Sequence, residues 1–243
     1  MSTPKILYED DSILVLDKPA GWVVNDAKTA HGNPIIQSWI GKNFNFPLSG
    51  DVEMRGGIVH RLDKDTSGIL LIGKTRKAFE SLQDQFKERT VKKSYFALVH
   101  GNVKNDSGTI SESVGRLPWN RERFGVLPAG KPSETYYELK DRYKDPNGNS
   151  CTLLKATPKT GRTHQIRVHL KHIGHPIVSD SFYAGRKTSR KDKLWCSRLF
   201  LHSGEITFTH PTEGKIMNLS CPLPKDLRQC LDCLIMINIP SRN

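Results

Sequence analysis

The stretch HRLDKDTSGILLIGKT, residues 60–75, places a strongly polar turn directly before an apolar run. Its second half contains four consecutive aliphatic residues and predicts a buried β-strand at 69–73. Thr75 follows this strand and can cap a helix over 76–89, where Phe79, Leu82 and Phe86 recur on one face. The stretch therefore predicts a polar turn, a strand and a helix in that order.

Working outward, the pattern predicts several more strands and a few helices. Strands are expected in the segments 6–24, 92–101, 108–115, 133–143, 150–158 and in a hairpin over 198–220. Helices are expected over 33–41, over 163–174 with Gly174 just past its end, and after Pro224. No repeat, low-complexity linker or shift in composition divides the chain. We therefore expect one α+β domain over residues 1–243, with a mixed, mainly antiparallel sheet and flanking helices.

The charge balance favours a polyanion as partner. The chain has 243 residues, 37 Lys+Arg against 25 Asp+Glu, and a formal net charge of +12. Neutralisation of phosphates supplies most of the non-specific affinity of proteins for nucleic acids. Basic residues cluster at 87–93 and at 186–193, and the second cluster lies in a stretch that is typical of a loop. A merely soluble basic protein remains the alternative.

Other features predict a cytoplasmic protein. No apolar run approaches the roughly 20 residues that span a bilayer, and the N-terminus lacks the pattern of a signal peptide. The five cysteines are an odd number in a chain large enough to fold without disulfides, which favours reduced thiols. Cys230 and Cys233 form an isolated CxxC in a predicted closing helix, where no second ligand pair indicates a metal.

Two patterns imitate well-known sites. Residues 68–75 match GxxxxGK[ST], but the four intervening residues are aliphatic and suit a buried strand better than a phosphate-binding loop. This mismatch argues against a P-loop phosphohydrolase. Four histidines lie between 164 and 175, yet no carboxylate joins them on the predicted helix, and Arg162, Arg167 and Lys171 bring positive charge to this segment. A basic helix facing an anion is therefore preferred to a metal site.

The polar turn itself carries the strongest chemical signal. Arg61 and Lys64 flank Asp63 and favour its ionised form, which can serve as nucleophile or base. Aspartate is also a common turn residue, so a purely structural role for Asp63 stays open on these residues alone. Asp65, Thr66 and Ser67 are expected to shape the turn that presents it.

HRLDKDTSG resembles the signature of the RluA-type pseudouridine synthases, with Asp63 at the position of that family's catalytic aspartate. Other segments resemble the family in the same order, namely DKPAGWVV (17–24), KKSYFALVHG (92–101), GRTHQIRVHL (161–170) and RLFLHSGEITFTHP (198–211). The resemblance covers about residues 6–222. It implies the pseudouridine synthase fold, with a central active-site cleft. Since the match begins near the N-terminus, we expect the minimal catalytic form without an accessory RNA-binding domain.

The resemblance also implies an activity, which is the isomerisation of uridine to pseudouridine within ribosomal or transfer RNA. Large-subunit ribosomal RNA is slightly favoured as substrate. The reaction needs no metal, no other cofactor and no nucleotide. The implied catalytic residues are Asp63, Tyr95 and Arg167, and the implied substrate-binding residues are Arg61, Leu201, His60 and Arg162. A monomer is expected.

The implied roles divide the work of the reaction. Asp63 starts cleavage of the glycosidic bond, and Arg167 pairs with it. Tyr95 stacks on the uracil of a nucleotide that has left the helical stack, and Leu201 closes the pocket. Arg61 fills the gap left in the RNA or grips a phosphate.

Other interpretations stay open beside these roles. Tyr95 fits plain strand core, Arg167 fits a phosphate contact, and His60 fits scaffold hydrogen bonding. Asp180 fits either a turn or a partner that holds Arg167. The alternative for the whole chain is a non-catalytic RNA-binding protein that acts in ribosome assembly on the same fold.

Overall fold

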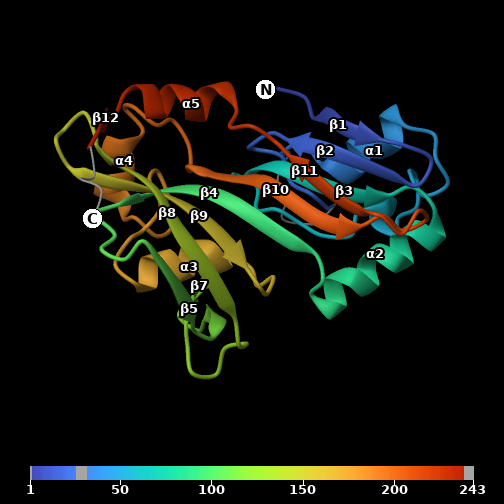
Figure 1. Cartoon of the computed structure of the whole chain (residues 1–243), viewed down its shortest axis with the longest axis horizontal. Coiled ribbons are helices and arrows are strands. Elements are labelled where there is room, and N and C mark those ends of the chain that lie inside the picture. The colour runs from blue at the N-terminus through green and yellow to red at the C-terminus, as the bar shows by residue number, and fades with distance from the viewer. Residues whose placement is uncertain (1, 26–31, 238–243) are drawn as a thin grey trace. The chain divides into compact units, whose positions relative to one another are not determined.

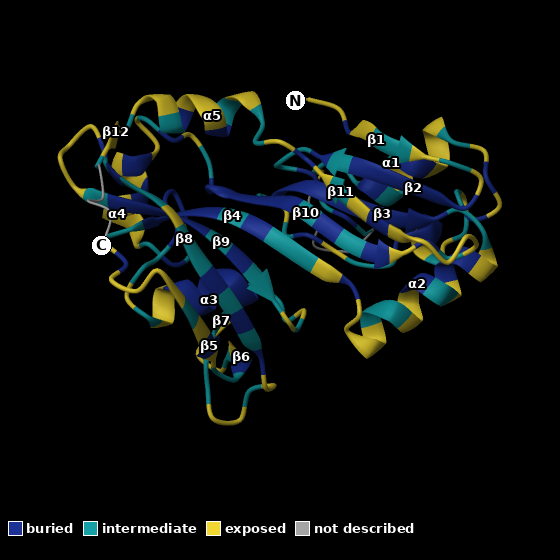
Figure 2. Ribbon diagram, viewed as in Figure 1, coloured by how far each residue is buried: buried dark blue, intermediate teal, exposed yellow. Residues whose placement is uncertain are grey.

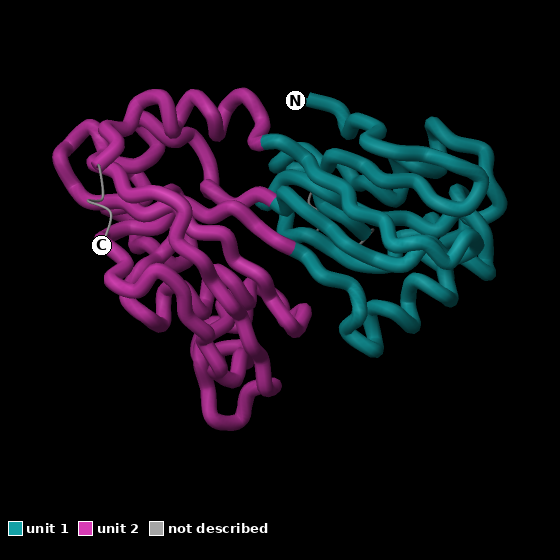
Figure 3. Tube along the Cα trace, in the orientation of Figure 1, with its two compact units in different colours: residues 1–93, 203–222 teal, residues 94–202, 223–243 magenta. Residues whose placement is uncertain are grey.

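The structure is a computed structural model that describes residues 2–25 and 32–237 (Figure 1). Helices and mainly antiparallel strands are mixed along the chain, which confirms the predicted α+β class. The chain divides into two compact units, which Figure 3 colours separately. Unit 1 comprises residues 1–93 and 203–222, and unit 2 comprises residues 94–202 and 223–243. That both units make up one catalytic domain over 1–243 stays a prediction.

Unit 1 is built on antiparallel strands with two helices. The strands follow the order β1 (Lys5–Glu9), β2 (Ile13–Lys18), β3 (Ser67–Gly73) and β10 (Leu201–Thr209), and β11 (Ile216–Ser220) pairs with β10. The helices are α1 (Ile36–Asn43) and α2 (Arg76–Glu88), with a short 3-10 turn at Arg55–Gly57. Figure 2 shows β2 and β3 mostly in the colour of buried residues. Their core includes Ile13, Leu71, Leu82 and Phe208.

The aliphatic run after the polar turn lies in the fully buried core of unit 1, as do the first four residues of β2. Ile69, Leu70, Leu71 and Ile72 have no exposed surface and form the centre of β3. A strand in this place confirms the argument against a P-loop, since a phosphate-binding loop needs exposed backbone amides. Two glycines frame the run because the backbone passes too close for a side chain. A Cβ on Gly68, whose φ is +111°, would lie 2.2 Å from the Ser203 carbonyl oxygen.

Helix α2 begins where the sequence predicts and ends one residue earlier, at Glu88. The Thr75 hydroxyl accepts a hydrogen bond from the Ala78 N–H at 3.2 Å, which satisfies one free amide of the first turn. Ala78, Phe79 and Leu82 are buried on one face. The spacing of apolar residues therefore both forms the helix and attaches it to the sheet.

Unit 2 holds a second set of antiparallel strands. They follow the order β4 (Lys92–His100), β9 (Ser150–Pro158), β8 (Glu134–Lys144) and β12 (Ile235–Met236), and β5 (Ser107–Ser111) pairs with β8. A separate hairpin consists of β6 (Val114–Leu117) and β7 (Asn120–Val126). The helices are α3 (Gln165–His172), α4 (Arg186–Asp192) and α5 (Lys225–Asp232). Among residues 2–25 and 32–237, no helix has both the length and the apolar composition to reach across a bilayer.

Two local predictions for unit 2 are wrong. The expected strand at 108–115 is split, because its first part pairs with β8 and its last part pairs with β7. The basic cluster at 186–193 is not a loop, since residues 186–192 form α4. Asp192 is buried there and accepts from the Ser179 N–H at 2.9 Å while pairing with His100 at 3.0 Å. These contacts with residues far away in the sequence stabilise α4, whereas its run of basic residues gives no sign of a helix.

Candidate active site

The polar turn holds Asp63 between a buried and an exposed neighbour in unit 1. Leu62 is buried, Lys64 is exposed, and Asp63 itself is half-buried; Arg61 is exposed as well. The Asp63 carbonyl accepts the Thr66 N–H at 3.1 Å and closes the turn. The turn thus carries a half-buried acidic side chain two residues after an exposed arginine, and such a cation can attract an anionic substrate toward the carboxylate.

A buried lysine fastens this turn to the segment that follows β2. Lys18 has no exposed surface, and its Nζ donates to the carbonyls of Pro19, Trp22 and Lys64 at 3.1, 2.9 and 3.1 Å. The Gly21 N–H donates to the same Lys64 carbonyl at 2.8 Å. A cation that binds several carbonyls lowers the cost of its own burial and rigidifies both loops. The backbone of Lys64, directly after Asp63, is therefore fixed by both the Lys18 side chain and the Gly21 N–H.

His60 lies under the turn as a neutral ring. Its Nε2 accepts the Leu71 N–H at 2.9 Å, and the ring stacks on Phe86 with centroids 4.9 Å apart. Burial, with a smaller contribution from the charge of Lys93, lowers the pKa of His60 well below its ordinary value. Burial likewise lowers the pKa of Lys93 to about 8. These contacts favour the scaffold interpretation of His60 over direct contact with substrate.

The basic residue of the GRTHQIRVHL segment is held by a buried carboxylate in unit 2. Arg167 in α3 donates through Nε and Nη2 to the two oxygens of Asp180 at 2.8 and 2.9 Å. Their side chains are 5% and 0% exposed. Asp180 also accepts the N–H groups of Phe182 and Tyr183 at 3.0 and 3.1 Å. Asp180 is therefore both a turn residue and the partner of Arg167, so the two open interpretations are both correct.

Aromatic rings complete the surroundings of Arg167. Its guanidinium carbon lies 5.4 Å from the Phe182 ring centroid and 5.0 Å from that of Tyr183. The Tyr183 hydroxyl accepts the Phe124 N–H at 3.1 Å and bonds His164 Nδ1 at 2.8 Å. Cation–π contacts and a bidentate carboxylate leave the guanidinium little freedom to rotate. A rigid cation in this place can orient an anion without reorganising.

Gln165 organises the loop that leads into α3. Its side-chain oxygen accepts from the Arg162 N–H at 3.0 Å and from the Thr160 hydroxyl at 2.7 Å. Its Nε2 donates to the Glu134 carbonyl at 2.9 Å and to the Thr135 hydroxyl at 3.0 Å. Sequence analysis missed this role. The signal was a glutamine inside an otherwise apolar and basic helix start, where a buried amide needs several partners.

The remaining predicted site residues are buried in strands. Tyr95 in β4 is 7% exposed and pairs with Ala156 of β9. Leu201 begins β10 and is 3% exposed. Both side chains therefore belong to rigid elements, which is the arrangement that a shaped binding pocket requires.

Comparison with known proteins identifies the family. The model of the RNA pseudouridylate synthase family matches residues 12–172. The chain belongs to this family. It is 40% identical over 238 residues to the ribosomal large subunit pseudouridine synthase D of Nitrosomonas europaea. The matched region makes up 95% of this chain but only 65% of that relative. The chain is 39% identical to the synthase C of Escherichia coli K12, covering 94% of this chain and 69% of that protein.

A solved structure supports the fold of this synthase-family chain. Human RNA pseudouridylate synthase domain containing 1 superimposes with a TM-score of 0.75 at 26% identity, over 99% of this chain and 91% of that one. The predicted family and the predicted pseudouridine synthase fold are thus confirmed. The predicted roles of the individual site residues stay predictions.

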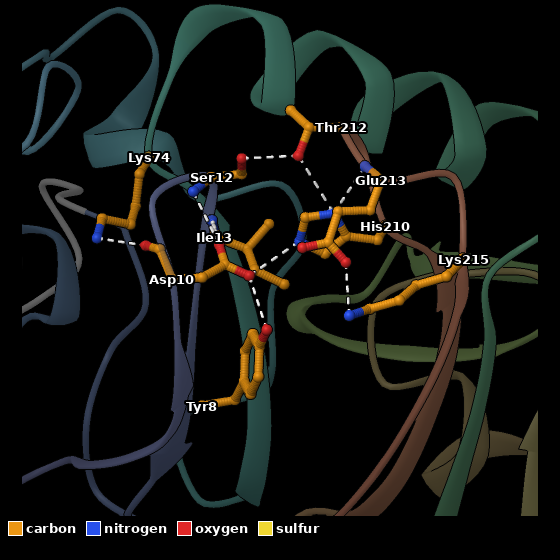
Figure 4. Close-up of polar contacts among 9 residues, drawn as sticks. All are labelled: Tyr8, Asp10, Ser12, Ile13, Lys74, His210, Thr212, Glu213 and Lys215. Atoms are coloured by element: carbon orange, nitrogen blue, oxygen red, sulfur yellow. Dashed lines mark hydrogen bonds and ion pairs between the residues drawn. The ribbon is translucent and has the colours of Figure 1, made fainter.

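A group of possible metal ligands lies in unit 1, outside the predicted site. Ligand atoms of Asp10, His210 and Glu213 lie within 4.8 Å of one another (Figure 4). These atoms are already engaged by the protein. The Glu213 N–H donates to His210 Nδ1 at 3.1 Å, so we assign the ring proton to Nε2, which lies 2.9 Å from Asp10 Oδ2. The group acts as a clamp between the β1–β2 turn and the β10–β11 turn.

Replacement of Asp10 should alter the acid stability of the protein. Burial raises the pKa of Asp10, but hydrogen bonds from the Ile13 and Ser12 N–H groups and from Tyr8 and His210 outweigh it and lower the pKa below 3.8. A carboxylate with a lowered pKa stabilises the native state above its unfolded pKa and loses that effect as pH falls through its folded pKa. We expect Asp10→Asn to reduce the free energy of unfolding at neutral pH.

The difference from wild type should shrink as pH falls below about 4. Urea unfolding at several pH values measures it. Asp11→Asn is the matched control, because Asp11 is the adjacent carboxylate and is exposed. A difference between Asp10→Asn and wild type that stays constant with pH would contradict the clamp.

Proposed function

We propose that this protein isomerises uridine to pseudouridine in RNA. Membership in the RNA pseudouridylate synthase family, together with the anchored turn that carries Asp63, is the observation that supports it. In this reaction the bond between ribose C1′ and uracil N1 breaks, the base turns, and C1′ bonds to C5. The proton lost from C5 is balanced by the proton gained at N1. The product is an isomer, so no group is consumed.

The proposal assigns one task to each of five predicted residues. Asp63 supplies the carboxylate that starts cleavage of the glycosidic bond, and Arg167 is its basic partner. Tyr95 stacks on the uracil and directs its hydroxyl toward C5, and Leu201 forms an apolar wall. Arg61, exposed beside Asp63, contacts the RNA from which the target nucleotide has been extruded. These assignments rest on the motifs and on the rigidity of each residue within its own unit.

Large-subunit ribosomal RNA is the proposed substrate, because relatives similar over most of this chain are named as ribosomal large subunit synthases. We further propose that the protein works in the cytoplasm as a monomer. Four of its five cysteines are buried as free thiols, which supports a reducing compartment.

The test uses transcripts of large-subunit ribosomal RNA and of transfer RNA labelled with tritium at uracil C5. We expect the wild-type protein to release tritium from the ribosomal transcript and to leave the transfer RNA unchanged. Release from transfer RNA alone would refute the substrate. Tight binding of both RNAs without release would favour the non-catalytic RNA-binding alternative.

A further inference from the structure

A cationic hollow lies beside the β6–β7 hairpin of unit 2. It has a volume of about 470 Å³, and its lining comes from β6 and β7, from the segment 129–131 and from the loop before α3. Three of the lining residues are cations and three are glycines, namely Arg116, Lys131, Arg162, Gly115, Gly130 and Gly161. Among the described residues that line it there is no carboxylate. The hollow is thus built for an anion about as large as a nucleotide phosphate with its sugar.

Arg162 brings an unsatisfied donor to this hollow. Its Nε is buried and has no hydrogen-bond partner among the described residues. A buried guanidinium N–H without an acceptor is costly, so such a group in a native site points to a ligand. Phosphate oxygens match the planar fork of a guanidinium, which can donate two parallel hydrogen bonds to them.

The backbone around the hollow is fixed before any ligand arrives. The Arg162 N–H is held by Gln165, as described above. Lys131 exchanges two backbone hydrogen bonds with Val114 of β6, at 2.9 and 3.0 Å. A Cβ on Gly130 would lie 2.7 Å from the Val114 carbonyl carbon, so the close approach of these segments requires glycine there.

The third cation is oriented by its own hairpin. The Arg116 guanidinium carbon lies 5.0 Å from the Phe124 ring centroid, and its Nη1 donates to the Arg121 carbonyl at 2.6 Å. Phe124 also lines the hollow. A preorganised cation loses less side-chain entropy on binding than a free surface arginine does. The three cations therefore approach one anion from three fixed segments.

We propose that the cationic hollow binds a backbone phosphate of the RNA substrate outside the modified nucleotide. The identity of the RNA rests on the proposed function, whereas the anion site rests on the hollow itself. Arg162 stands five residues before Arg167 on a loop that Gln165 holds rigid. A phosphate bound here would therefore fix the register of the RNA with respect to α3.

The deciding measurement is the salt dependence of RNA binding by the double variant Arg116→Gln/Lys131→Gln. Each phosphate contact contributes roughly 0.7–0.9 to the slope of log K against log salt. We expect affinity for the ribosomal transcript to fall about tenfold at ~0.1 M salt and the slope to decrease by about 1. Arg162→Lys should weaken binding while keeping the slope, because it retains the charge but lacks the guanidinium fork.

The matched control is Arg76→Gln/Lys140→Gln, which removes the same charge from surface residues already paired with Glu80 and Glu138. It should change affinity less than twofold. An equal loss of affinity and slope in the control, or a wild-type slope in the hollow variant, would overturn the proposal.

The anion in the hollow could be a backbone phosphate of RNA or free inorganic phosphate. Titrations with each of the two at constant ionic strength distinguish these sources. We expect a short oligoribonucleotide to shift the amide signals of Gly115 and Gly130 at lower concentration than inorganic phosphate does. Signals that respond to inorganic phosphate alone would show an adventitious ion only and overturn the RNA assignment. All these readouts measure binding, so an absence of tritium release would refute the proposed function without deciding this site.

Discussion

Asp63→Asn should abolish tritium release from RNA, lowering the single-turnover rate by at least about 10³-fold. Asparagine has nearly the same volume and keeps the polar character of the turn, but it cannot act as a nucleophile or accept a proton. The turn is held by Lys18 and by the backbone bond between Thr66 and Asp63, neither of which uses the Asp63 carboxylate. The turn should therefore stay folded, and RNA affinity should stay close to that of the wild type.

Asp65→Asn is the matched control for this experiment, since it removes a carboxylate from the same turn. We expect it to change the rate less than tenfold. Rapid-quench tritium release, thermal unfolding and filter binding together separate a chemical defect from a folding or binding defect. Substantial turnover by Asp63→Asn would refute the assignment of Asp63 as the reacting carboxylate.

Asp180→Ala should be the most destabilising of the carboxylate substitutions, costing about 3–5 kcal/mol. It removes the bidentate partner of Arg167 where both side chains are almost fully buried. It also takes the acceptor from the Phe182 and Tyr183 N–H groups. A buried guanidinium that loses its carboxylate keeps its desolvation penalty without the compensating attraction.

The chain offers a matched pair for comparison. Arg198 donates through Nε and Nη2 to both oxygens of Asp226, which is the same connectivity, but the Asp226 side chain is 45% exposed. Water there replaces the lost bonds, so Asp226→Ala should cost only about 1 kcal/mol. Urea unfolding of both variants measures the difference. Equal losses would show that burial does not set the strength of these ion pairs.

Much of the fold follows from local patterns in the sequence. The aliphatic run 69–72 and the spaced apolar residues of α2 predict their elements, because burial of one face decides both. The hairpin strand β7 carries three charged residues near its start and has only Phe124 and Val126 as alternating apolar residues, a pattern too short to predict it. Helix α4 is equally hidden, since its stability comes from the contacts of Asp192 with Ser179 and His100.

The candidate site is predictable to a similar degree. Its motif points to Asp63, and the resemblance points to Arg167, because both are carried by residue types in a fixed order. The supporting contacts are not predictable in this way. Lys18 bonds three backbone carbonyls, and carbonyl groups leave no trace in a sequence. The pairing of Asp180 with Arg167 spans thirteen positions, and in the sequence it is only one of two open interpretations of Asp180.

The return of the chain to unit 1 has a consequence for its synthesis on the ribosome. Strand β3 takes β10 as its neighbour, and β10 with β11 supplies Ile206, Phe208 and Met217 to the same core. A nascent chain that has emerged only to residue 93 therefore exposes an open strand edge and an unfilled apolar surface. More than a hundred further residues must be translated before either is covered. During that interval the incomplete unit 1 stays soluble only if its aggregation is slower than translation or if a chaperone covers the exposed surface.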